Sequence, residues 1–333
     1  MRSYVSHVRS GVVGLILVVW ALAASSAGDS LEISGRIALP GVEGRFDHFA
    51  FDPASGRLFV AALGNNSIEI IDTRSAKRVT SVRGVDEPQG LAFVPPGRLI
   101  VANGGSGDVQ VREGQDLHPV ATIKTHGDAD NVRYDPAARR AYVGVASGAL
   151  VAIDPATAKK LGEVRLAAHP ESFQLERAGT RTFVNVPNAH QIAVVDRRSM
   201  SLVSIWRVTA AAANYPMALD EDDKRLFVVC RSPSRVLVYD TSSGTMTSSF
   251  ETVGDADDAF WDAERKRLYV IGGQGFVDVY RRESGDRFTR TAHVPTGSGA
   301  RTGLFVPELD RLFVAAPHRG AQAAGILIIE PRD

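Results

Sequence analysis

The sequence has a single cysteine and no excess of charge of either sign. Cys230 is the only cysteine in 333 residues, so neither an intramolecular disulfide nor a cysteine-based zinc site can form. Because it lies in the apolar run Leu226–Cys230, we expect a buried structural thiol rather than a nucleophile. The 38 basic residues balance the 38 acidic residues, which argues against nucleic acid as a partner.

Long apolar runs are also scarce, and the one present lies at the N-terminus. Residues 11–24 are apolar throughout, follow the basic residues Arg2 and Arg9, and lead into small residues. This order predicts a cleaved signal peptide over residues 1–27. A membrane anchor is the alternative, but the run is short for a span of about 20 residues. We therefore expect a periplasmic or secreted protein, with no membrane attachment after cleavage.

No convincing helical period occurs after this segment, and a repeat is present instead. The phrase Arg, any residue, bulky residue, Val recurs seven times at spacings of 41 to 44 residues. The copies begin at Arg57, Arg98, Arg140, Arg181, Arg225, Arg267 and Arg311. Each lies among short β-rich runs bounded by Gly, Pro or Asp turns. The repeat predicts an all-β, seven-bladed β-propeller with four-stranded antiparallel blades.

The repeat also predicts the blade boundaries within one domain over residues 28–333. The seventh unit ends after its third strand, at Ile326–Ile329, and residues 31–39 form an unpaired alternating run. We expect this N-terminal strand to close the last blade and so remove an open sheet edge. The expected blades span residues 44–83, 84–124, 125–167, 168–209, 210–252, 253–295 and 296–330.

The units resemble the YVTN-type β-propeller repeat family. The matching strand–loop–strand phrase is clearest in residues 140–154 and 225–240, and the resemblance extends over almost the whole mature chain. It implies an exported bacterial propeller of the YncE-like kind. Three units depart from the Asp that ends the third strand elsewhere, and there we assign Arg112, Tyr280 and Glu330 to that position. Because such repeats are structural, the resemblance leaves the function open.

A short acidic phrase occurs twice, in HGDADN and VGDADD. Its residues Asp130 and Asp257 are 127 residues apart, close to three repeats, so both should enter an innermost strand and face each other across the central channel. The equivalent positions of the seven blades form a first ring: Asp47, Gln89, Asp130, Glu171, Tyr215, Asp257 and Arg301. The following positions form a second ring: His48, Gly90, Asn131, Ser172, Pro216, Asp258 and Thr302.

Two interpretations of these rings remain open. Polar residues often end strands in turns, so part of the first ring needs no function. Four acids around one opening repel one another, however, which favours a site where something neutralises them. The loops between second and third strands share that face and add His190, His318 and Arg319. The candidate ligand-binding residues are therefore Asp47, His48, Gln89, Asp130, Asn131, Glu171, Tyr215, Asp257, Asp258, Arg301, His190, His318 and Arg319.

The leading functional hypothesis is an exported binding protein that holds a small ligand or protein partner at this acidic channel mouth. The alternative is a metal-dependent hydrolase of the lactonase type, or a lyase, in the same place. Oxygen ligands suit Ca²⁺, and the candidate metal ligands are Asp47, Asp130, Asn131, Glu171 and Asp257. The candidate catalytic residues are His48, Asp258, His318 and Arg301. The sequence has no nucleophile elbow, phosphate loop or cofactor motif. A divalent cation such as Ca²⁺ is a candidate cofactor, and only the alternative hypothesis requires it.

Overall fold

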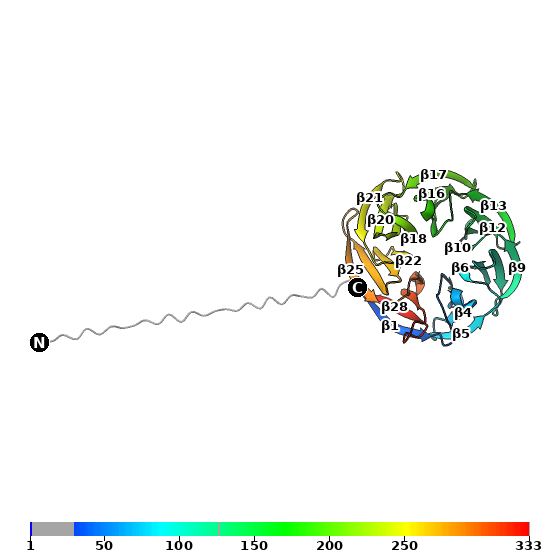
Figure 1. The fold of residues 1–333 in the computed structure, drawn as a ribbon, viewed down its shortest axis with the longest axis horizontal. Helices are drawn as coiled ribbons and strands as arrows, with labels where there is room; N and C mark the ends of the chain where they lie inside the picture. The colour runs from blue at the N-terminus through cyan, green and yellow to red at the C-terminus, as the bar shows by residue number, and fades with distance from the viewer. Residues whose placement is uncertain (2–29, 126, 333) are drawn as a thin grey trace.

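The structure, a computed structural model, describes residues 30–125 and 127–332 together with Met1. The signal peptide predicted over residues 1–27 lies outside the described chain segments. In these segments the chain forms seven four-stranded antiparallel sheets arranged as a ring around a central axis (Figure 1). No helix among the described residues has the length and apolarity needed to cross a bilayer. The predicted all-β, seven-bladed propeller is confirmed.

In each of the first six blades the strands follow in chain order from the channel to the rim, as Figure 1 shows for β6 and β9. Blades 1 to 3 are β2 (Phe49–Asp52), β3 (Arg57–Ala62), β4 (Ser67–Asp72), β5 (Lys77–Val82); β6 (Pro88–Val94), β7 (Arg98–Asn103), β8 (Asp108–Glu113), β9 (His118–Lys124); and β10 (Ala129–Asp135), β11 (Arg140–Val145), β12 (Ala149–Asp154), β13 (Lys159–Arg165). Blades 4 to 6 are β14 (Phe173–Leu175), β15 (Arg181–Val186), β16 (Gln191–Asp196), β17 (Ser201–Arg207); β18 (Ala212–Asp220), β19 (Arg225–Ser232), β20 (Ser234–Asp240), β21 (Met246–Glu251); and β22 (Ala256–Asp262), β23 (Arg267–Gly272), β24 (Phe276–Arg282), β25 (Phe288–Pro295).

The seventh blade joins the two ends of the described chain. It contains β26 (Gly303–Val306), β27 (Arg311–Ala316) and β28 (Gly325–Arg332), and its outer strand is β1 (Ser30–Ala38). β1 pairs antiparallel with β28, for example Ile37 with Ile326, and Figure 1 shows the two strands side by side. The predicted closure by the N-terminal strand is confirmed.

The repeated Arg-x-bulky-Val phrase forms the second strand of every blade, where the five residues after the arginine are buried. These strands are covered by sheets on both sides, so near-continuous apolar runs fit them. The fourth strands consist mostly of exposed and partly buried residues, as β5 does at the rim. Cys230 lies in a second strand, is fully buried, and has its pKa raised to about 12 by burial. Its thiol therefore stays protonated at neutral pH.

The strand register corrects part of the sequence alignment at the end of the third strand. The repeat arginine pairs there with an Asp in blades 1, 4 and 5, as Arg225 does with Asp240. In blade 2 the paired residue is Glu113, and Arg112 lies one position earlier. In blade 6 it is Arg281, and Tyr280 lies one position earlier. The assignments of Arg112 and Tyr280 were therefore wrong by one residue, because a one-residue shift leaves the local composition almost unchanged.

The innermost strands approach one another closely enough that one glycine is required. A Cβ built on Gly90 in β6 would lie 2.1 Å from the Asp130 carbonyl oxygen and 2.8 Å from the Val132 amide nitrogen of the neighbouring blade. Both atoms belong to the backbone of β10, so neither can move without shifting that strand.

We expect Gly90→Ala to destabilise the protein by about 1–3 kcal/mol, the usual cost of overpacking. Gly97→Ala is the matched control, because a Cβ there meets nothing within 4 Å. Urea unfolding followed by circular dichroism measures both variants. Equal stability of the two would show that blades 2 and 3 are spaced more loosely than in this structure.

Candidate functional site

The side chains of the two rings meet inside the channel, at the entry of the innermost strands. The strand pairing places the ring positions at equivalent points of the blades, as the pairs Asp52–Arg57, Asp135–Arg140 and Asp262–Arg267 show. Six of the predicted site residues are less than 9% exposed: Asp47, His48, Gln89, Asp130, Asn131 and Asp258. The acidic residues thus form a largely buried centre, where the sequence suggested an open mouth.

His48 lies between two carboxylates of this centre. Its Nδ1 lies 3.2 Å from Oδ1 of Asp258, and its Nε2 lies 3.5 Å from Oδ1 of Asp47. The second oxygen of Asp258 accepts a hydrogen bond of 2.9 Å from the amide of Gly303. Burial alone would lower the pKa of His48, but the carboxylates of Asp258 and Asp47 outweigh it and raise that pKa to about 10. The imidazole is therefore a cation at neutral pH, with both nitrogens facing carboxylates.

A carboxyl cluster surrounds this cation and comprises Asp47, Asp130, Glu171 and Asp257. One ligand atom each from Asp47, His48 and Asp130 lies within 4.8 Å of the others. Burial, with the charges of Asp130 and Asp257 added, raises the pKa of Asp47 to about 7 against the opposing effect of His48. Burial and the same two aspartates raise the pKa of Glu171 to about 9. The cluster therefore retains protons that isolated carboxyl groups would lose.

Two arginines that the sequence reasoning missed take part in the same centre. Nη2 of Arg231 lies 2.5 Å from Oδ1 of Asp257, and its guanidinium carbon stacks 4.0 Å from the ring centroid of Tyr215. Burial raises the pKa of Asp257, and Arg231 opposes that rise. Arg133 extends from β10, and its Nη1 donates a 2.9 Å hydrogen bond to the carbonyl of Val132. Burial lowers the pKa of Arg133, with Asp258 and Asp130 opposing.

The remaining predicted residues have partners outside the centre. Gln89 donates to Asp128 at 2.7 Å, and Arg301 pairs with Asp255 at 3.0 Å. The loop residues are exposed: His318 faces Glu43 at 2.7 Å, Arg319 donates to Ser298 at 3.4 Å, and His190 ends a short 3₁₀ turn. The structure thus brings together Asp47, His48, Asp130, Glu171, Asp257 and Asp258, and leaves His190, His318 and Arg319 on the rim.

A cavity of about 490 Å³, here named the central cavity, reaches this centre from the opposite face. His48 and Asp258 line its inner end, and Pro53, Pro95 and Pro136 line it at the turns between first and second strands. Most of its wall is apolar, with contributions from Phe49, Phe51, Phe93, Met217, Phe260 and Leu304. The sequence reasoning placed function on the other face, where it found polar loops.

The alternation of side chains along the innermost strands would have identified this wall from the sequence. Residues two positions after the second ring lie on the same side of the strand. They form a third ring: Ala50, Ala92, Arg133, Gln174, Ala218, Phe260 and Leu304. All of these except Ala218 line the central cavity. Arg133 is the only charged member of this ring, and a charged side chain among apolar ones indicates a role beyond packing.

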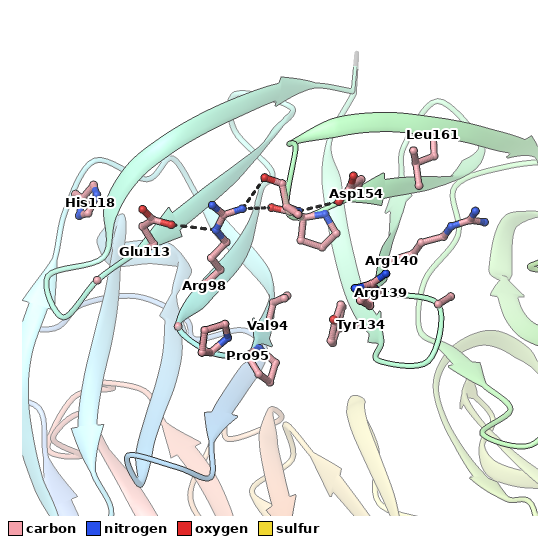
Figure 2. A pocket seen from close by; sticks show the side chains of 16 residues that line it. Val94, Pro95, Arg98, Glu113, His118, Tyr134, Arg139, Arg140, Asp154 and Leu161 are labelled. Atoms are coloured by element: carbon pink, nitrogen blue, oxygen red, sulfur yellow. Dashed lines mark hydrogen bonds and ion pairs between the residues drawn. The ribbon is translucent and has the colours of Figure 1, made fainter.

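A second hollow of about 960 Å³ lies between blades 2 and 3 and is here named the outer groove. Figure 2 shows Arg98 at its centre, where Nε lies 3.0 Å from Glu113 and Nη1 donates to the carbonyls of Pro155 and Ala156 at 2.7 and 2.8 Å. The contacts of Arg98 are thus with the protein itself and tie two blades together. None of the predicted site residues lines this groove.

Comparison with known proteins shows the fold alone. No protein-family model and no curated protein matches the chain. A chain in the crystal structure of a mitotic checkpoint complex is similar with a TM-score of 0.78 and 12% identity, over 98% of this chain and all of that one. A chain of Kuenenia stuttgartiensis hydrazine synthase is similar with a TM-score of 0.71 and 18% identity, over 83% of this chain and 95% of that one. Both similarities support the β-propeller fold and nothing beyond it.

The buried carboxyl groups predict a stability that falls as pH rises. A carboxyl group whose folded-state pKa is raised stabilises the fold at low pH, and this contribution is lost as pH rises through the folded-state value. The window runs from 3.8 to about 7 for Asp47 and from 4.5 to about 9 for Glu171. Glu171→Gln keeps the side chain neutral at every pH. We therefore expect its melting temperature to match the parent at pH 5 and to exceed it by about 2–4 °C at pH 9.

Calorimetric melting across this pH range measures the effect. Glu264→Gln, on an exposed turn, is the control and should show no pH-dependent difference. A Glu171→Gln variant that is less stable than the parent at pH 9 would show that Glu171 is ionised in the folded protein.

Proposed function

We propose that the chain is a binding protein that holds a small ligand in the central cavity. The observation that carries the proposal is a cavity of about 490 Å³ with an apolar wall and an ionic inner end. Ligand sites of about 300–1,000 Å³ with apolar walls and a few convergent polar groups are the usual kind in proteins. The propeller in a mitotic checkpoint complex is similar in fold, which is consistent with a binding role.

The state of His48 favours binding over catalysis. A histidine that acts as a general base needs an unprotonated ring nitrogen and a pKa near the working pH. Both ring nitrogens of His48 face carboxylates, and its pKa is raised to about 10. The YVTN-type repeat residues and the predicted signal peptide over residues 1–27 support placing this binding protein in the periplasm or outside the cell.

A neutral aromatic probe tests the binding site. We expect 4-phenylbutan-1-ol to bind saturably with one-to-one stoichiometry in isothermal titration calorimetry. Ala92→Phe fills the cavity wall and should weaken this binding by about tenfold or more, because it removes the volume that the phenyl group occupies. Ala50→Leu on the adjacent blade is a second filling variant.

The matched control is Ala156→Phe, which places the same bulk in the outer groove and should leave the affinity unchanged. Absence of binding to the parent, or equal binding to Ala92→Phe and Ala50→Leu, would show that the central cavity is not the site.

The second candidate function is that of a hydrolase or lyase that depends on a bound divalent cation, and one observation favours it. Oδ1 of Asn131 is buried without a hydrogen-bond partner, while Nδ2 of the same side chain donates to Asp130 at 3.4 Å. An unpartnered amide oxygen beside carboxylates suits a hard cation such as Ca²⁺. The candidate ligands are Asp47, Asp130, Asn131, Glu171 and Asp257, and the cation would displace the protons that the cluster retains. His48 does not fit a metal, because both of its nitrogens are engaged.

A double-mutant cycle tests the cation. If the cluster binds Ca²⁺, added Ca²⁺ should raise the melting temperature of the parent more at pH 8 than at pH 6, since protons compete with the metal. Asp130→Asn and Asp257→Asn should each remove most of this increase, and the double variant should add little to either. Asp222→Asn, an exposed control, should retain it. No Ca²⁺-dependent change in the parent would remove this candidate.

A further inference from the structure

The ionisable side chains that line the central cavity are unequal in their hydrogen bonding. His48 has carboxylate oxygens within 3.5 Å of both nitrogens, and Asp258 is engaged through both oxygens, by His48 and by the amide of Gly303. Among the described residues Arg133 makes one hydrogen bond, from Nη1 to the carbonyl of Val132. A guanidinium has five N–H donors, so most of those of Arg133 remain available.

No carboxylate of the described residues lies within ion-pair distance of Arg133. Asp258 and Asp130 act on it only at longer range, and the ring of Phe173 lies 5.7 Å from its guanidinium carbon. Removing a cation from water without a paired anion is costly. Arg133 is partly buried, so the cavity contains a positive charge that is partly removed from water and that no carboxylate of the described residues pairs.

The charges of the lining agree with this reading. Two basic side chains, His48 and Arg133, and one acidic side chain, Asp258, line the cavity. Asp258 pairs with Nδ1 of His48, so no acidic side chain of the lining is left to pair with Arg133. Asp47 lies 3.5 Å from Nε2 of His48 and does not line the cavity. A ligand with a single negative charge would supply the missing partner of Arg133.

The wall of the central cavity indicates the chemistry of the rest of the ligand. Phe51, Phe93, Met217, Phe260 and Leu304 line the cavity together with Arg133. These side chains offer apolar and aromatic contacts and no charge, so the ligand body that fills this space is apolar. The rigid turns at Pro53, Pro95 and Pro136 frame its entrance.

We propose that the central cavity binds a small monocarboxylate with an apolar body, whose carboxylate pairs with Arg133 and whose body lies against the aromatic wall. This inference rests on the proposed function and specifies its ligand class. A guanidinium–carboxylate pair is charge-assisted and directional, which gives the site a preference for this head group over a neutral or cationic one.

Three probes with the same body and different head groups test the preference on the unaltered protein: 4-phenylbutyrate, 4-phenylbutan-1-ol and 4-phenylbutylammonium. We expect the carboxylate to bind about tenfold or more tightly than the alcohol, the factor of a hydrogen bond to a charged group. The ammonium compound should bind most weakly, because Arg133 repels it. Calorimetry at pH 7 and low salt measures all three.

Arg133→Gln should remove the preference, lowering the affinity for 4-phenylbutyrate to that for the alcohol while changing the alcohol affinity less than about threefold, because Gln keeps the polarity without the charge. Arg133→Lys should keep part of the preference. Arg139→Gln, an exposed arginine in the turn after the same strand, is the control and should change nothing.

The outcomes separate this inference from the proposed function. If the alcohol binds in a manner sensitive to Ala92→Phe but the carboxylate binds no more tightly, the channel binds ligands and the carboxylate assignment is wrong. Tightest binding of the ammonium compound would show that the carboxyl cluster dominates the site, which also overturns the assignment. If none of the three probes binds, both proposals fail. The head-group ranking needs no variant, so it decides the question even if Arg133→Gln does not fold.

Discussion

The antiparallel pairing of β1 with β28 holds the ring closed, and the channel depends on that closure. A chain with one cysteine has no disulfide to join its ends, so the backbone hydrogen bonds and the buried side chains of this pair do so. Ile37, Ile326 and Ile328 lie in one apolar cluster with side chains of blade 1. Closure removes the sheet edges and holds the seven innermost strands at fixed positions around one axis.

Fixed strand positions make a buried ionic centre possible. His48 belongs to blade 1 and Asp258 to blade 6, with blade 7 between them, yet their side chains lie 3.2 Å apart. The desolvation of several charges in one place is offset by pairing of His48 with two carboxylates, of Arg231 with Asp257, and by retained protons. The centre therefore also links blades that share no sheet.

The two ends of the channel differ in chemistry. The end that the loop face covers is polar and largely buried, with Arg231, Asp257 and the carboxyl cluster. The end toward the turns between first and second strands is a cavity with an apolar wall and one unpaired guanidinium. A ligand bound as proposed would lie with its apolar body toward the turn face and its polar head at the ionic centre.

The sequence by itself determined the period, the number of blades, the closing strand and the equivalence of the ring positions. These features follow from local patterns, since alternation and turn residues repeat every 41 to 44 residues. The register of the third strand was less secure, and Arg112 and Tyr280 were assigned one residue from the position that the pairing gives to Glu113 and Arg281.

Only the tertiary structure decided which ring residues meet and which end of the channel is open. Distances across a channel depend on the radius of the ring and on the reach of side chains, neither of which a linear pattern contains. For that reason Asp258 could be placed in the second ring but not against His48, and His318 could be placed on the loop face but not against Glu43. The lack of an ion pair at Arg133 likewise depends on all the strands around it. It can be recognised only when the positions of all the neighbouring side chains are known.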